Sequence, residues 1–208
     1  MELITGNDEV LLADLDAKLL DAILVHAIPE NRHDWFNPIA VDGLVFLIHP
    51  DNGISNLTLN QIQDIFSGRT LTWAGVGGSD QPIQLLTREA GAGARALFQA
   101  RIMAEQRVSI TALVQPDDAA MRQAVVATPG SIGYSMMGQS SNQVGARLLA
   151  VAGISPTPAT TANQTYPLSV PLYFVSLAEP QGELRAFLAW LQSEAGQTLL
   201  SEKYGRVR

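Results

Sequence analysis

The sequence predicts an α/β protein. Three short apolar runs, residues 21–26, 83–86 and 172–175, have the length and composition of buried strands, and longer segments with helical spacing alternate with them. The run at residues 21–26 is almost wholly apolar, as in a parallel sheet that is covered on both faces. Hydrophobic residues make up 47% of the 208-residue chain, so a sizeable core can form.

Turn and capping residues predict the other elements. Thr58 and Gln61 form a capping box that opens a helix, and Gly68 is expected just after its last turn. Residues 6–8 are interpreted as the turn and cap before the first helix, and residues 155–164 as an irregular connection. Further strands are expected at residues 3–5, 36–40, 43–48, 108–114 and 132–134, and further helices at residues 10–19, 94–102, 117–127, 183–192 and from 194 onward.

Composition argues against several kinds of partner and chemistry. The chain has 13 Lys and Arg against 20 Asp and Glu, a net charge of −7, so we expect no nucleic-acid partner. It has no cysteine, no zinc-protease or serine-hydrolase motif, and its three histidines lack metal-ligand spacing. No apolar run approaches the ~20 residues of a membrane span, and we expect no signal peptide at the first residues. Binding without an enzymatic reaction, a metal or a cofactor therefore fits the sequence better than catalysis.

Residues 83–103 contain the strongest functional pattern. A buried strand leads into a turn with two glycines and then into a helix, which aims unpaired backbone N–H groups and the positive end of a helix dipole at one point. Such a point binds an anion, and glycines let a ligand come close to the backbone. We therefore expect an anion at the N–H groups of Gly91, Ala92, Gly93 and Ala94. The alternative is that the glycines only turn the chain.

Two side chains are candidates to join this loop. Arg88 can direct a bidentate guanidinium fork at the same anion, or it can pair with Glu89 or another carboxylate instead. His26 stands at the carboxyl end of the strand predicted at residues 21–26, where open α/β sheets place their ligands; otherwise it caps a loop. Arg95, further along the predicted helix, is expected to face solvent.

Sequence phrases along most of the chain resemble one family, the phosphate-type solute-binding proteins of ABC importers. These phrases lie at residues 39–44, 50–52, 55–58, 65–68 with Trp73, 87–89 with Gly91 and Gly93, 129–134, and from 166–168 through 195–197. The opening, Thr5 and Gly6 followed by residues 24–27, is closer to tungstate-type binding proteins of the same superfamily.

The resemblance implies a two-lobed fold of the periplasmic-binding-protein type II kind. Residues 1–79 plus 168–208 would form lobe I, and residues 80–167 would form lobe II. The lobes would close on a tetrahedral oxyanion (phosphate, sulfate, molybdate or tungstate) held by Arg88, His26 and the amides of residues 91–94. The full-length protein would lie in the periplasm or outside the cell, associated with the membrane, and would deliver the anion to an ABC permease.

The chain departs from the family pattern in two ways. In the family, hydroxyl side chains stand at the positions of Ala92 and Ala94, and phosphate binders have a carboxylate at the position of His26. Without these groups, we expect this chain to bind its anion loosely and without preference for phosphate. Members of the family also have one more β-α unit, together with a leader sequence, before the segment that starts here at residue 2. This chain is therefore expected to be either a trimmed form of a longer protein or a naturally reduced relative. An exposed strand edge would favour a homo-oligomer. The alternative function is a degenerate sensor or interaction domain that kept the fold and lost high-affinity anion binding.

Overall fold

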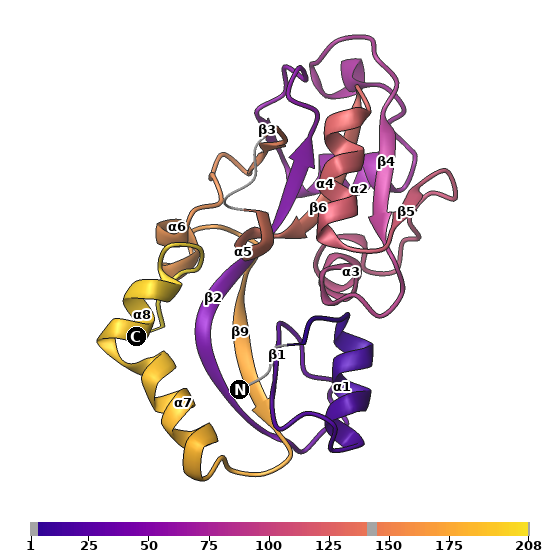
Figure 1. The fold of residues 1–208 in the computed structure, drawn as a ribbon. Helices are drawn as coiled ribbons and strands as arrows, with labels where there is room; N and C mark the ends of the chain where they lie inside the picture. The colour runs from indigo at the N-terminus through magenta and orange to yellow at the C-terminus, as the bar shows by residue number, and fades with distance from the viewer. Residues whose placement is uncertain (1–3, 141–144, 208) are drawn as a thin grey trace.

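The computed structural model describes residues 4–140 and 145–207, which form a mixed α/β fold (Figure 1). One sheet has the strand order β1-β9-β2-β6-β4-β5 with β7 also on β2, and β3 pairs with β8 separately. The strands are β1 Ile23–Val25, β2 Trp35–Ile48, β3 Asn56–Leu57, β4 Gln84–Arg88, β5 Leu113–Gln115, β6 Ser131–Met136, β7 Arg147–Leu148, β8 Ala150–Val151 and β9 Ser169–Ser176. The helices are α1 Asp8–Asp16, α2 Leu59–Phe66, the 3₁₀ helix η1 Trp73–Val76, α3 Gly93–Phe98, the π-helix η2 Gln99–Met103, α4 Asp118–Ala127, α5 Met137–Ser140, α6 Pro158–Ala162, α7 Gly182–Gln192 and α8 Glu194–Leu200.

Strand β2 joins the two halves of the molecule that Figure 1 shows below and above its middle. Its first part, from Trp35 to Gly43, pairs antiparallel with β9, and its last part, from Leu44 to Ile48, pairs antiparallel with β6. The two extended segments predicted here are one continuous strand, with an irregular register just after Pro38. Because proline has no N–H to donate, an interrupted ladder at this residue is expected.

The upper half is built around one large core. Side chains from β2, α2, α3, β4 and β6 meet there, and they include four aromatic rings whose neighbouring centroids lie 4.2–6.1 Å apart, Phe46, Phe66, Phe98 and Tyr134. Aromatic pairs in such stacked and edge-on geometries contribute ~0.5–1.5 kcal/mol beyond the area they bury. This core holds β4 and α3, which flank the predicted anion-binding loop.

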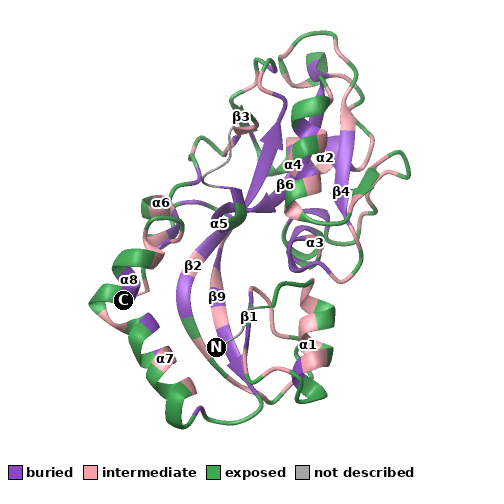
Figure 2. Cartoon of the chain, in the orientation of Figure 1, coloured by how far each residue is buried: buried purple, intermediate pink, exposed green. Residues whose placement is uncertain are grey.

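The lower half is a sheet of β1, β9 and the first part of β2 with helices on both faces. Helices α7 and α8 cover one face, where Phe174 and Leu188 pack together, and α1 covers the other, where Leu15 packs against Val25 and Val175. Figure 2 shows the buried residues of β2 and β9 between these two layers. Phe174 and Val175 reach opposite faces because neighbouring side chains of a strand alternate.

The division into two lobes stays a prediction, and the packing of the core bears on where their boundary would lie. Residues 1–79 were expected in lobe I, but Leu57, Ile62 and Trp73 share one core with Leu85 and Tyr134 of the expected lobe II. We therefore propose that the boundary lies inside β2, near residue 43, where the pairing of this strand changes from β9 to β6.

Several predicted elements near the N-terminus are wrong. Ile4 and Thr5 are not in a strand, and Leu3 lies outside the described residues. Helix α1 ends at Asp16, three residues early, because Lys18 adopts a positive φ of 57°, and Leu19 is 72% exposed. Strand β1 is an antiparallel edge strand and not part of a parallel sheet buried on both faces; Leu24 is 42% exposed.

Elsewhere the capping residues predicted local structure well. The capping box of Thr58 and Gln61 opens α2, and Gly68 follows its end with φ 79°. Asp117 caps α4 as expected. Two predictions need correction. Of the strand expected at 108–114, only residues 113 and 114 lie in a strand, β5, and the connection at 155–164 contains the short helix α6. Among the described residues, none of the helices has both the length and the apolar character to cross a membrane.

Candidate anion-binding site

Three parallel strands bring polar side chains to one edge of the upper sheet. Strand β4 pairs parallel with both β5 and β6, so the carboxyl ends of all three strands meet. Arg88 ends β4, Asp118 begins α4 just after β5, and Ser135 lies near the end of β6. Arg88 Nη1 donates to Asp118 Oδ1 at 2.6 Å, and Ser135 Oγ donates to the same oxygen at 2.6 Å. Ligands of open α/β sheets bind at this kind of edge.

The Arg88 side chain is only 7% exposed and already has carboxylate partners. Its Nε and Nη2 donate to the two oxygens of Glu89 at 3.1 and 3.2 Å, which is the alternative that the sequence left open. Burial lowers the pKa of the Arg88 guanidinium, but its hydrogen bonds to Glu89 and Asp118 and the negative charges of these two residues raise it by more. The pKa of Arg88 is therefore raised. Arg95 does not simply face solvent: it is half-buried, and its Nη1 donates to the Arg88 carbonyl at 2.9 Å.

The glycine loop was expected to let a ligand come close to the backbone; in the structure the chain's own helix α1 lies against it. Gly91 turns the chain with φ 83°, and its carbonyl accepts the N–H of Glu9 at 3.2 Å. A Cβ on Gly91 would lie 2.7 Å from Glu9 Oε2, and a Cβ on Gly93 would lie 2.6 Å from Asp8 Cγ and overlap Asp8 Oδ2. The two glycines therefore admit the first turn of α1.

His26 follows β1 and is tied to the crossing strand β2. Its Nε2 lies 2.9 Å from Asp42 Oδ2, and the other Asp42 oxygen accepts the N–H groups of Gly43 at 2.7 Å and Gly138 at 3.0 Å. Burial disfavours protonation of His26, but its bond to Asp42 and the charges of Asp42, Asp8 and Asp118 outweigh burial. The pKa of His26 is therefore raised, which favours an imidazolium cation.

The Asp8 carboxylate lies where the two halves meet. It lies against Gly93, where an added Cβ would come within 2.6 Å of Asp8 Cγ. The backbone N–H groups of Gly93 and His26 and the side chains of His26 and Arg88 are near enough to lower the pKa of its carboxyl. Its Oδ2 is buried and has no hydrogen-bond partner of good geometry among the described residues. Burial raises the pKa of the Asp8 carboxyl, and the charge of His26, the two N–H groups and Arg88 offset only part of that rise.

The structure thus brings together part of the predicted set. Arg88, His26 and the N–H group of Gly93 all lie near the Asp8 carboxylate. Gly91 contacts Glu9 instead, and the side chains of Ala92 and Ala94 are buried, with Ala92 capping α3 without a side-chain hydrogen bond. The role of all six residues as ligand contacts stays a prediction.

Sequence reasoning missed three carboxylates of this site. Asp8 and Asp118 were assigned only to helix starts, and Asp42 was given no role. Asp118 could have been found, because a helix start after a strand parallel to β4 must lie at the same edge as Arg88. Among the residues described, no three or more His, Asp or Glu side chains are grouped so as to hold a metal ion.

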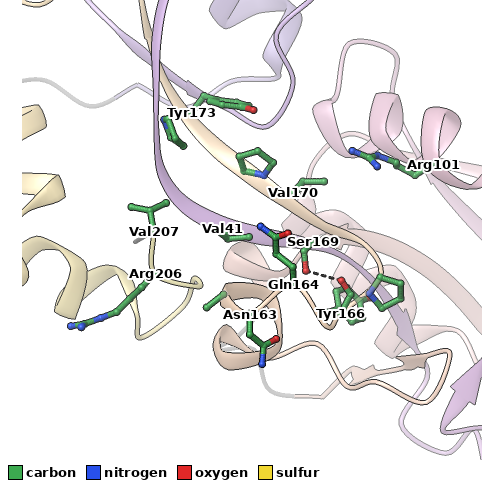
Figure 3. Close-up of a pocket in the computed structure, with 14 residues that line it drawn as sticks. Val41, Arg101, Asn163, Gln164, Tyr166, Ser169, Val170, Tyr173, Arg206 and Val207 are labelled. Atoms are coloured by element: carbon green, nitrogen blue, oxygen red, sulfur yellow. Dashed lines mark hydrogen bonds between the residues drawn. The ribbon is translucent and has the colours of Figure 1, made fainter.

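A hollow of about 830 Å³ lies away from this point. Figure 3 shows it between β2, β9, the α6 region and the C-terminal segment, with Val41, Tyr166, Tyr173 and Arg206 in its wall. Its lining includes none of the six predicted site residues.

Comparison with known proteins decides the family. Residues 6–195 match the family model described as the PBP superfamily domain. The chain belongs to the PBP superfamily. It is 29% identical over 171 residues to the phosphate-binding protein PstS of Bacillus subtilis, covering 81% of this chain and 56% of that protein. It is 31% identical over 183 residues to PstS of Pseudomonas aeruginosa, covering 78% of this chain and 57% of that protein.

The fold of this PBP-superfamily chain also matches solved structures. A candidate phosphate ABC transporter substrate-binding protein from Clostridium perfringens, solved with bound phosphate, superposes with a TM-score of 0.88 at 23% identity, covering 96% of this chain and 84% of that one. The chain spans a little more than half the length of the two curated relatives. The tungstate-like interpretation of the first segment stays a prediction.

Proposed function

We propose that this chain is the solute-binding component of an ABC importer and holds a phosphate-like tetrahedral oxyanion between its two halves. The observation that carries the proposal is the convergence of Arg88, His26 and the N–H group of Gly93 on one carboxylate, that of Asp8. Two of these groups belong to the upper half and His26 to the lower half, so an anion at this point would bridge them.

The chemistry of these groups suits an oxyanion. A guanidinium, an imidazolium and a backbone N–H are all donors, and hydrogen bonds between such donors and an ionised oxygen are about twice as strong as neutral ones. His26 offers no carboxylate that would require a proton on the ligand. We therefore propose that sulfate, molybdate and tungstate bind at least as well as phosphate.

The relatives support the setting of the proposed function. The B. subtilis and P. aeruginosa relatives are phosphate-binding proteins. By analogy, we propose that this chain works outside the cytoplasmic membrane, is associated with it in the full-length protein and delivers its anion to an ABC permease. Because the chain covers 56% and 57% of these two relatives, both the setting and the partner are inferred from only part of each relative.

A second function is favoured by a specific observation. Glu89 and Asp118 already engage three nitrogens of Arg88, and Asp8 lies at the N–H of Gly93. A sensor or interaction domain that has lost high-affinity anion binding would keep such internal pairs. The two functions differ in whether a free oxyanion binds at all.

Titration calorimetry with phosphate, sulfate, molybdate and tungstate tests the proposal. The native chain should bind at least one of them, and Arg88→Ala and Arg88→Lys should both lose binding, because lysine keeps the charge without the fork. Arg185→Ala, on the exposed face of α7, is the matched control and should bind as the native chain does. Circular dichroism checks that each variant is folded. Absence of binding for all four anions would support the second function instead.

A further inference from the structure

The first turn of α1 is packed into the loop that was expected to hold the anion. Glu9 N–H donates to the Gly91 carbonyl at 3.2 Å, and the Asp8 carboxylate lies over Gly93, where a Cβ would come within 2.6 Å of Asp8 Cγ. Asp8 is the first residue of α1, and Asn7 caps that helix by accepting the Val10 N–H at 3.0 Å. The position of the carboxylate is therefore set by a capped helix.

This carboxylate has the properties of an internal ligand. It lies at the N–H groups of Gly93 and His26, and both Arg88 and His26 act on its charge. Each of these groups is a donor that would also meet an oxygen of a tetrahedral anion. Its Oδ2 is buried without a well-formed hydrogen bond within the described part of the chain, so the fit of the carboxylate is incomplete.

Around this point the carboxylates of the chain itself already outnumber its cations. The cations that face it are Arg88 at the end of β4, Arg95 in α3 and His26 after β1 when protonated. The carboxylates are Asp8 and Glu9 of α1, Asp42 of β2, Glu89 after β4 and Asp118 of α4. A dianion that entered here beside an ionised Asp8 would meet a surplus of negative charge, which costs free energy at short range.

We propose that Asp8 is a built-in competitor of the oxyanion: its carboxylate occupies the anion position, and a ligand binds by displacing it. This inference rests on the proposed function for the site, and adds to it the residue that limits affinity. Incoming anions exchange their oxygens for those of Asp8 at the Gly93 and His26 N–H groups, and the first turn of α1 moves away from the glycine loop.

Two consequences follow for binding. Neutralising or shortening Asp8 removes the competitor, so affinity rises. Lowering the pH also weakens the competitor, since a protonated carboxyl holds N–H donors less strongly than a carboxylate does. Burial raises the pKa of Asp8, so this effect begins above the usual range of an aspartate. Protonation of His26 acts in the same direction, because it adds a positive charge.

Sulfate is the probe of choice, since it stays a dianion over the range in which a histidine titrates, whereas phosphate changes charge there. Calorimetry should show that Asp8→Asn and Asp8→Ala tighten sulfate binding about tenfold at neutral pH, a difference of ~1.4 kcal/mol. Glu9→Gln is the matched control, because it removes an acid from the same helical turn that contacts Gly91 and not Gly93. Because Glu9 contributes its charge but no contact with Gly93, Glu9→Gln should tighten sulfate binding much less than the Asp8 variants do.

A second measurement does not depend on any ligand. In the anion-free protein, two-dimensional ¹H–¹⁵N spectra should show the amide signals of Gly93 and His26 titrating together with Asp8. The titration should persist in Glu9→Gln and vanish in Asp8→Asn. Amides that do not follow Asp8 would overturn the inference, and so would native binding that Asp8→Asn and Asp8→Ala fail to tighten. If neither native chain nor variants bind sulfate or phosphate while the amides still titrate, the proposed function fails, and Asp8 competes with no external anion.

Discussion

The hydrogen bonds of Asp42 allow a quantitative prediction. Asp42 lies in β2 where the strand leaves β9 and joins β6, and its side chain is 1% exposed. It accepts the N–H groups of Gly43 at 2.7 Å and Gly138 at 3.0 Å and pairs with His26 Nε2 at 2.9 Å. Asp42→Ala leaves these buried partners without an acceptor, and breaking a buried charged pair costs about 3–5 kcal/mol.

Asp42→Asn separates charge from hydrogen bonding. The amide oxygen can still accept the two N–H groups, while the amide nitrogen faces His26 Nε2, so only the charged pair is lost. Losing one hydrogen bond to a charged group costs about 1.5–3 kcal/mol. The folded-state pKa of His26 is raised, so the stability that it contributes is fully present below its ordinary pKa of 6.5 and is lost as the pH rises through the raised value. The deficit of Asp42→Asn should therefore shrink at high pH.

Urea unfolding, followed by tryptophan fluorescence at several pH values, measures these differences, and NMR titration of the imidazole measures the His26 pKa. Asp51→Asn is the matched control, because Asp51 lies 3.9 Å from His49 but its side chain is 91% exposed. That exposed pair should contribute less than about 1 kcal/mol. The reasoning from burial would be refuted if Asp42→Ala lowered the free energy of unfolding no more than Asp51→Asn does. It would also be refuted if Asp42→Asn left the His26 pKa unchanged.

Three further predictions concern the glycine loop, Asp8 and the edge of the sheet. Gly93→Ala should push the Asp8 carboxylate aside and return the Asp8 pKa toward its ordinary value. Because the new Cβ would fill the proposed anion position itself, anion binding should not tighten as it does in Asp8→Ala. Gly53→Ala, with open space around its Cβ, should be neutral, and an unchanged Asp8 titration in Gly93→Ala would contradict the packing. Because the folded-state pKa of Asp8 is raised, the stability that this carboxyl contributes is fully present below pH 3.8, its ordinary pKa, and is lost as the pH rises through the folded-state pKa. Asp8→Asn should therefore be more stable than the native chain at neutral pH and equally stable in acid, which thermal unfolding scans can check. Strand β1 is an exposed edge of the sheet, so we predict that the chain self-associates through it. Leu24→Lys, at an exposed position of this strand, should lower the associated fraction measured by light scattering. A monomeric native chain would count against this prediction.

Local patterns in the sequence were enough to predict most of the elements. The box of Thr58 and Gln61, the cap at Asp117 and the positive φ of Gly68 each depend on residues within a few positions of one another. The strand before Arg88 and the glycine turn after it were predicted for the same reason. Such features follow from backbone hydrogen bonding over one or two turns, which the identity of neighbouring residues largely decides.

Tertiary structure decided what surrounds the glycine loop. Asp8 and Gly93 are 85 positions apart, and no local pattern indicates that the first turn of α1 packs against that loop. The partners of Arg88 were left open by the sequence because Glu89 is adjacent while Asp118 is 30 positions away, and the parallel pairing of β4 with β5 brings both to one edge. Residue types set which groups can carry charge or donate hydrogen bonds; long-range packing sets which of them meet, and in this chain it places a carboxylate among the donors expected for an anion.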